Sequence, residues 1–115
     1  MRRGEIWLID FEPSRAEEAD KRRPAVIVTN DGANVRADQL GRGVITVVPL
    51  TSKVDRVQPF QVLLPSADTG LPRNSKAQAE QVMSVAVTRV GMLIGRGPHD
   101  LLDEVDEALR LHLAL

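Results

Sequence analysis

Two short segments of the chain carry the side chains best suited to chemistry. Arg23 stands directly before a proline, which favours an extended backbone for it, and an apolar strand is predicted over residues 24–29. Its guanidinium is a planar, permanently charged fork of donors that matches a phosphate. Thr51 and Ser52 follow a second apolar strand, predicted over residues 44–50. If the two strands are neighbours in a sheet, we expect Arg23 and Thr51 to share one pocket.

The residue types that the chain lacks exclude several kinds of site. It has no cysteine, which excludes disulfides and thiolate metal sites. Its two histidines, His99 and His112, lie near the C-terminus and are interpreted as a loop residue and a helix-end cation. Neither a zinc-binding HxxxH pattern, nor a GxGxxG or GxxxxGKS/T phosphate loop, nor a GxSxG motif occurs. We therefore predict no metal site and no cofactor.

One reaction needs neither a protein nucleophile nor a metal. RNA carries its own nucleophile, the 2′-hydroxyl, so its cleavage needs in-line geometry, proton transfer and positive charge on the phosphate oxygens. Arg23 can supply this charge, and Glu18 can accept a proton. The hydroxyls of Thr51 and Ser52 can hydrogen-bond the phosphate. Because a guanidinium stays protonated in proteins, Arg23 is interpreted as a charge clamp rather than a proton shuttle.

The charges are unevenly distributed along the 115 residues of the chain. Residues 1–96 carry 14 Lys and Arg against 11 Asp and Glu, a net charge of +3, and residues 97–115 carry one against five, a net charge of −4. A polyanion would meet the first part, although solvated faces alone also explain the pattern. No apolar run reaches the roughly 18 residues of a membrane span, and the charged start does not resemble a signal peptide. We expect one soluble domain in the cytoplasm.

Short apolar segments separated by polar, glycine-rich or proline-rich stretches predict a mainly β fold. Apolar residues at three- and four-residue steps near the C-terminus predict one amphipathic helix. The expected architecture is one small antiparallel barrel over about residues 1–96, with a C-terminal helix over about 98–114 packed against it. Strands are predicted over residues 4–11, 24–29, 44–50, 60–64 and 90–94, and an interrupted strand with a turn is predicted over 75–87. Residues 30–43 are predicted to be an irregular segment with about one helical turn, and residues 12–22 and 65–74 are predicted to be loops.

The first predicted strand alternates in a way that defines two faces. Trp7 is interpreted as a core or dimer-interface residue rather than a platform for stacking bases, since the chain has few aromatic residues. The alternation predicts Ile6, Leu8 and Asp10 on one face and Trp7, Ile9 and Phe11 on the other.

A series of short motifs, weak one by one, covers nearly the whole chain. They are Arg3-Gly4-Glu5-Ile6-Trp7, Arg23-Pro24-Ala25-Val26-Ile27-Val28, Asn30-Asp31 with Asn34, Val48-Pro49-Leu50-Thr51-Ser52, Pro59-Phe60-Gln61-Val62, Ser75, Ala79-Glu80-Gln81, Ile94-Gly95 and Val105-Asp106-Glu107-Ala108-Leu109. In this order and spacing, the chain resembles the MazF family of bacterial toxins, which includes the PemK and Kid proteins.

The resemblance implies an SH3-like, CcdB-like barrel with a C-terminal helix, assembled as a homodimer. It implies a metal-independent endoribonuclease that cleaves single-stranded RNA (mRNA, or tRNA or rRNA in some members) and leaves 2′,3′-cyclic phosphate and 5′-hydroxyl ends. A MazE-like antitoxin would neutralise it by laying an extended tail across the RNA groove. By position, the catalytic residues would be Arg23, Thr51 and the loop acid Glu18, although the loop reads Ala16-Glu17-Glu18-Ala19 and lacks the glycine of the family.

Further positions are expected from the resemblance to contact RNA. Each cation among them is also explained as an ordinary solvated charge, and Ser75 as a turn residue that satisfies backbone groups. The implied RNA-binding residues are Lys21, Arg22, Ser52, Lys53, Arg56, Asn74, Ser75, Lys76 and Gln81, and Arg73 lies beside them.

Two other functions remain open at this point. A CcdB-like toxin that poisons DNA gyrase without catalysis needs no Arg–Thr pair, and it predicts an aromatic or glycine-rich helix end. This chain instead ends Leu113-Ala114-Leu115. An RNA-binding dimer without catalysis predicts that the catalytic pair is disrupted, whereas both Arg23 and Thr51 are present.

Overall fold

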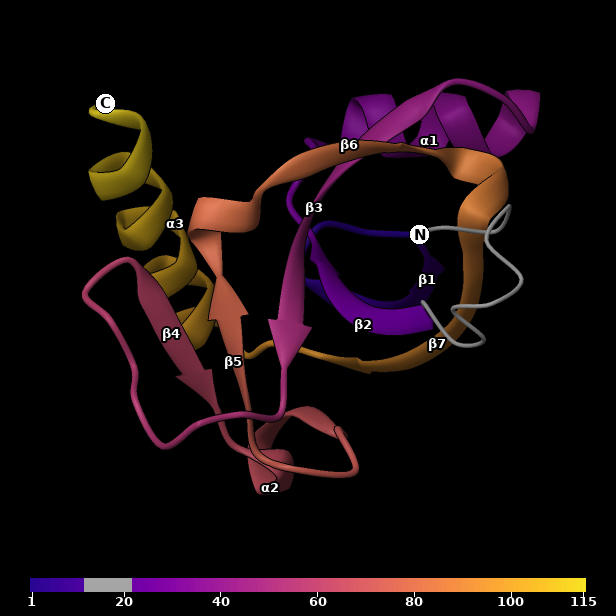
Figure 1. Ribbon diagram of the computed structural model, residues 1–115. Coiled ribbons are helices and arrows are strands. Elements are labelled where there is room, and N and C mark those ends of the chain that lie inside the picture. The colour runs from indigo at the N-terminus through magenta and orange to yellow at the C-terminus, as the bar shows by residue number, and fades with distance from the viewer. Residues whose placement is uncertain (12–21) are drawn as a thin grey trace.

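The computed structural model of the protein describes residues 1–11 and 22–115. Its strands are β1 (Glu5–Asp10), β2 (Arg22–Ile27), β3 (Val44–Thr51), β4 (Gln61–Leu64), β5 (Ser75–Gln78), β6 (Met83–Ala86) and β7 (Val90–Arg96). Its helices are α1 (Asp31–Leu40), α2 (Ser66–Thr69) and α3 (His99–Leu113), with 3-10 turns η1 (Ala79–Gln81) and η2 (Val87–Arg89). Across the described residues, the strands form one antiparallel sheet in the order β4-β5-β3-β2-β1-β7, with β6 also paired to β3 (Figure 1). The predicted architecture, an antiparallel sheet followed by a C-terminal helix, is confirmed.

Strand β3 organises the sheet. It pairs with β2 along one edge, and along the other edge with β6 in its first half and β5 at its end. This arrangement produces two buried clusters. One, which includes Ile6 and Val105, lies between the sheet and α3, and the other, which includes Ile9 and Ile45, lies under α1. In Figure 1, α3 lies beside β4 and β5, while α1 lies at the other end of the molecule, near β6.

The alternation predicted for the first strand is present in β1. Ile6 belongs to the cluster under α3, whereas Ile9 and Phe11 belong to the cluster under α1, with Trp7 packed against it. The indole Nε1–H of Trp7 donates to Glu5 Oε1 at 3.1 Å. Trp7 is thus a partly buried residue at the edge of a core, and the faces of β1 are those that the sequence predicts.

Helix α3 buries Leu101, Val105 and Ala108, which are spaced by four and three residues, against the sheet. Leu111 and Leu113, which continue the predicted apolar stripe, are 58% and 49% exposed. The stripe is therefore buried through the first turns of the helix and not in the last. None of the helices in the described part of the chain is long and apolar enough to cross a membrane.

The structure corrects the prediction for residues 30–43, because helix α1 occupies ten of them. The side chain of Asn30 caps the helix by accepting the N–H of Ala33 at 2.9 Å, and Gly41 ends it at a φ of 64°. Only Asn34 and Ala37 of this helix are buried. The helix therefore lacks the apolar periodicity on which the prediction relied, and its caps are the stronger signal.

A hydrogen-bond network joins the N-terminus to both long helices. The backbone N–H of Arg3 donates to Asp31 Oδ1 at 2.6 Å, and its guanidinium pairs with Asp106 at 2.5 Å and donates to Val28 O at 3.0 Å. The backbone hydrogen bond from Arg3, and next the side-chain hydrogen bond from Asn34, hold the pKa of the Asp31 carboxyl below its ordinary value. Helices α1 and α3 are thus both bonded to Arg3, two residues before β1.

Three predictions between residues 65 and 96 are also corrected. The loop predicted over 65–74 contains helix α2, and the interrupted strand predicted over 75–87 is two strands, β5 and β6, separated by η1. Strand β7 continues to Arg96 instead of ending at Ile94. A Cβ on Gly95 would lie 1.9 Å from Thr69 O, so glycine is what allows β7 to pass this close to α2.

Candidate active site

The strand register brings Arg23 and Thr51 together. In the antiparallel pair of β2 and β3, Ala25 lies opposite Pro49. Continuing this register by two residues sets Arg23 opposite Thr51, where β3 ends and β2 begins. Both residues line one cleft of about 640 Å³, in keeping with the shared pocket expected from the sequence.

The cleft has three sides and is strongly basic. Strand β2, the end of β3 and the loop before β5 form its sides, and this loop contributes Arg73. No Asp or Glu is among the described residues that line the cleft, so its electrostatic field favours a polyanion. The lining residues are Arg22, Arg23, Pro24, Leu50, Thr51, Ser52, Leu71, Pro72, Arg73 and Ser75.

The guanidinium of Arg23 is oriented by an aromatic ring. Its Cζ lies 5.3 Å from the centre of the Phe11 ring, a cation–π contact, and the side chain is exposed. Within the described ranges, this guanidinium makes no hydrogen bond or ion pair with protein groups. Its donors therefore remain available to an anion in the cleft.

The hydroxyl of Thr51 is held by the backbone that follows it. Thr51 Oγ1 accepts the N–H of Lys53 at 3.3 Å, which leaves the hydroxyl hydrogen free to donate. The arrangement can place a positive fork and a hydroxyl donor on one phosphate.

The loop opposite Arg23 is rigidified by its own hydrogen bonds. Residues 71–73, here called the cleft wall, follow helix α2. Ser66, the first residue of α2, holds this loop, because its N–H donates to Asn74 Oδ1 at 2.9 Å and its hydroxyl donates to Leu71 O at 2.7 Å. Thr69 Oγ1 donates to Pro65 O at 2.8 Å. These bonds fix the backbone that presents Arg73 to the cleft.

Several of the predicted RNA-binding residues lie in or beside the cleft. Arg22 and Ser52 line it, and Lys53 and Arg56 are exposed in the segment after β3. Lys76 is directed to the protein itself, since its Nζ donates to Arg56 O at 2.5 Å.

The other predicted contacts have different surroundings. Ser75 lines the cleft, but it is 6% exposed and its hydroxyl donates to Arg73 O at 3.1 Å, which favours the turn interpretation. The Oδ1 atom of Asn74 caps Ser66. Gln81 is exposed in η1 and is not among the described residues that line the cleft. Glu18 and Lys21 lie outside the described residues.

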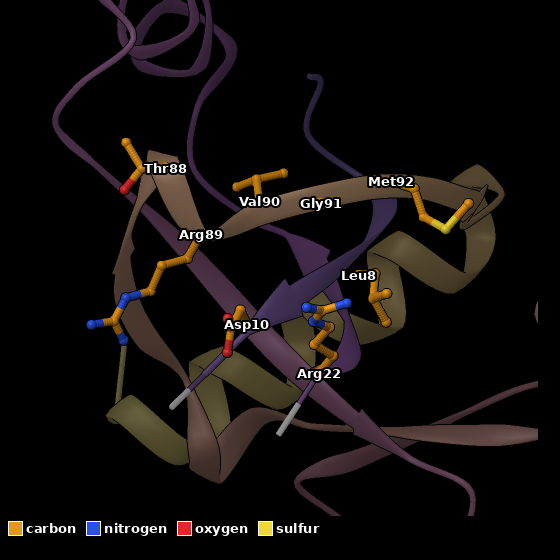
Figure 2. Close-up of a pocket in the computed structure, with 8 residues that line it drawn as sticks. All are labelled: Leu8, Asp10, Arg22, Thr88, Arg89, Val90, Gly91 and Met92. Atoms are coloured by element: carbon orange, nitrogen blue, oxygen red, sulfur yellow. The ribbon is translucent and has the colours of Figure 1, made fainter. Parts of the chain in front are cut away.

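A second pocket, of about 490 Å³, adjoins the cleft through Arg22 (Figure 2). Sequence reasoning did not assign it, although the alternation of β1 set Leu8 and Asp10 on one face. The guanidinium of Arg89 donates to Phe11 O at 3.2 Å. The lining residues are Leu8, Asp10, Arg22, Thr88, Arg89, Val90, Gly91 and Met92.

Comparison with known proteins agrees with the fold. Endoribonuclease MazF9 of Mycobacterium tuberculosis is 56% identical over 115 residues, which cover 100% of this chain and 98% of the relative. An endoribonuclease solved in complex with its cognate antitoxin, from a mycobacterial species, superposes with a TM-score of 0.79 at 20% identity and covers 100% of this chain and 96% of that chain. The M. tuberculosis toxin MazF-mt6 superposes with a TM-score of 0.78 at 22% identity, over 96% of this chain and 97% of that chain.

The family model described as PemK-like, MazF-like toxin of type II toxin–antitoxin systems matches residues 2–113. This span includes the strands that bear Arg23 and Thr51 and the helix that covers the sheet. The chain belongs to the PemK-like, MazF-like family of type II toxins.

Proposed function

We propose that this protein is the toxin of a type II toxin–antitoxin system and acts as a metal-independent, sequence-specific endoribonuclease on single-stranded RNA. The observation that carries the proposal is the cleft that holds Arg23 and Thr51 together, with no Asp or Glu among the described residues that line it. Its family and a 56% identical relative named as an endoribonuclease support the same activity.

The proposed reaction uses the 2′-hydroxyl of the RNA as nucleophile. Its oxygen attacks the adjacent phosphorus and the bond from phosphorus to the 5′-oxygen breaks, which leaves a 2′,3′-cyclic phosphate and a 5′-hydroxyl. Arg23 stabilises the charge on the non-bridging oxygens, and Thr51 donates a hydrogen bond to one of them. Glu18 is proposed as the acceptor of the 2′-hydroxyl proton on the family resemblance, and the 5′-oxygen takes a proton from solvent water.

Partners and location follow from the same proposal. A MazE-like antitoxin with an acidic, extended segment would compete with RNA for the arginine-lined cleft, because both present negative charge to it. We infer a homodimer that acts in the cytoplasm, where its RNA substrates are. The alternative of a gyrase poison has less support, because the family and the 56% identical relative are named for a toxin–antitoxin system and for RNA cleavage.

The test is cleavage of a long, mixed-sequence single-stranded RNA in EDTA, with the new ends sequenced and their chemistry assigned. The wild type should give discrete cuts with cyclic phosphate ends. Arg23→Ala and Thr51→Ala should each lower the cleavage rate by about 10²-fold or more while remaining folded. Intact RNA from the folded wild type would overturn the proposal, and cleavage that requires added Mg²⁺ would overturn its metal independence.

A further inference from the structure

The pocket beside the cleft contains a carboxylate where a purely phosphate-binding surface would have none. Asp10, the last residue of β1, lines this pocket with Arg22 and Arg89. Within the described ranges, its carboxylate makes no hydrogen bond or ion pair. Figure 2 shows the side chains of Leu8, Asp10 and Arg22 lying between those of Arg89 and Met92.

The chemistry of a carboxylate limits which groups of an RNA strand Asp10 can bind. A carboxylate repels a phosphate, and a single carboxylate in a pocket that two arginines also line is a poor site for a divalent cation. It accepts hydrogen bonds and donates none, and N–H donors in RNA are found on the Watson–Crick edges of the bases. Asp10 is therefore suited to a hydrogen-bond donor on a base edge or on a ribose, and not to a phosphate.

The rest of the pocket suits the flat face of a base. Leu8, Val90 and Met92 give it apolar surface, and Met92 is 65% exposed, so this surface is open to a ligand. Gly91 allows β7 to lie close to β1 beside the pocket, because a Cβ there would lie 3.1 Å from Leu8 O. Single-stranded RNA is read by this combination, an apolar or aromatic face beneath the base and polar groups at its edge.

The pocket is also close to the place where the bond would be cleaved. Asp10 lies directly opposite Arg22 in the ladder between β1 and β2, and Ile9 lies opposite Arg23. Directly opposed residues of an antiparallel pair have Cα atoms about 4.5–5.5 Å apart. Arg22 lines both the pocket and the cleft, so a nucleotide whose phosphate lies in the cleft can place a neighbouring base in the pocket.

We propose that this pocket binds one base of the RNA next to the cleaved phosphate and that Asp10 determines which base is accepted there. The inference rests on the proposed endoribonuclease function and deepens it. Phosphate contacts in the cleft position the strand, and the contact of Asp10 with a base N–H supplies sequence information.

The experiment sequences the ends produced from a randomised single-stranded RNA by the wild type and by Asp10→Asn. Discrimination at one position of the cleaved motif should fall by roughly tenfold, since a good base contact is worth about that factor or more. Preferences at the other positions and the salt dependence of RNA binding should stay unchanged. Asp103→Asn, the same change at an exposed position of α3, is the matched control and should retain the wild-type motif.

A second variant separates base recognition from a general effect of charge. Met92→Ala removes apolar surface without changing charge, and it should weaken discrimination at the same position of the motif. An unchanged motif in both Asp10→Asn and Met92→Ala would overturn the base pocket while leaving the endoribonuclease proposal intact. A wild type that produces no discrete ends would instead overturn the proposed function, so the two failures are distinguishable.

Discussion

At the scale of single residues, the site depends on which guanidiniums and hydroxyls are already engaged by the protein. Arg23 is oriented by Phe11 and makes no hydrogen bond with the described part of the chain, whereas Ser75 and Asn74 bond to the backbone of Arg73 and Ser66. Arg73 is exposed and lines the cleft across from β2, so it is the cation most directly presented to a bound strand from the cleft wall.

Arg73→Ala should therefore weaken RNA binding at low salt and reduce the slope of log affinity against log salt by about one, as expected for one lost phosphate contact. Binding is measured over a salt series with a catalytically inactive Thr51→Ala background. The matched control is Arg42→Ala, which removes an exposed arginine before the opposite end of β3. An equal slope in both variants would show that Arg73 does not contact a phosphate.

At the scale of elements, the position of the cleft wall depends on helix α2 and on its contact with β7. The absence of a Cβ at Gly95 allows Thr69 O to approach β7, and Thr69 and Leu71 are 4% and 3% exposed. The wall is therefore packed from behind by a strand that does not itself line the cleft.

Gly95→Ala should displace α2 and the cleft wall, because the added Cβ would lie 1.9 Å from Thr69 O. We expect the free energy of unfolding to fall by about 1–3 kcal/mol, as for overpacked sites, and RNA cleavage to slow in the folded protein. Urea unfolding and cleavage rates are measured together. Gly32→Ala, whose Cβ would meet only Asn30 Oδ1 at 3.3 Å, is the control and should change the free energy by less than about 1 kcal/mol. Equal stability of the two variants would contradict the role assigned to Gly95.

The network of Arg3 and Asp31 gives the attachment of α1 a dependence on pH. The pKa of the Asp31 carboxyl is lowered in the folded protein from its ordinary value of 3.8, first of all by the hydrogen bond from the Arg3 backbone. A lowered folded-state pKa means that the stabilisation is fully present above 3.8 and is lost as the pH falls through the folded-state value. Asp31→Asn should thus be less stable than the wild type at pH 7, and the difference should shrink in acid. Chemical unfolding over a pH series measures this, and a difference that grows in acid would contradict it.

At the scale of the whole molecule, basic and acidic side chains are concentrated on different elements. The arginines surround the cleft at the ends of β2 and β3, whereas the exposed acids Asp103, Glu104 and Glu107 lie on α3, beside β4. The net charge of −1 therefore conceals a basic cleft and an acidic helix. RNA is expected to bind at the former, and long-range repulsion from α3 is largely screened at physiological salt.

Neutralising all three acids of α3 to Asn or Gln should leave the cleaved motif and the slope of RNA affinity against salt as in the wild type. The reason is that these side chains contact neither the cleft nor the pocket of Asp10. RNA binding over a salt series and sequencing of the cleaved ends measure both quantities. A changed motif would show that RNA also runs over α3.

Several features of the fold follow from signals that lie close together along the chain. Neighbouring residues are enough to predict the alternation of β1, the buried β-branched strands β2 and β3, and the apolar stripe of α3. They also predict the extended backbone of Arg23 before its proline. With the family resemblance, these signals were sufficient for the architecture and for the pairing of Arg23 with Thr51. They were not sufficient for α1, which has good caps but little apolar periodicity.

Which distant residues share a surface could be read from the folded chain and not from its sequence. The cleft wall, some 20 residues after Thr51, lies across the cleft from Arg23. Asp10, Arg89 and Met92 line one pocket. The folded chain also shows that the polar groups of Asn74 and Ser75 bond to nearby backbone groups. The physical reason is that a hydrogen bond or a pocket depends on distances between segments, and these distances are set by how β3 pairs with three other strands and not by any local pattern.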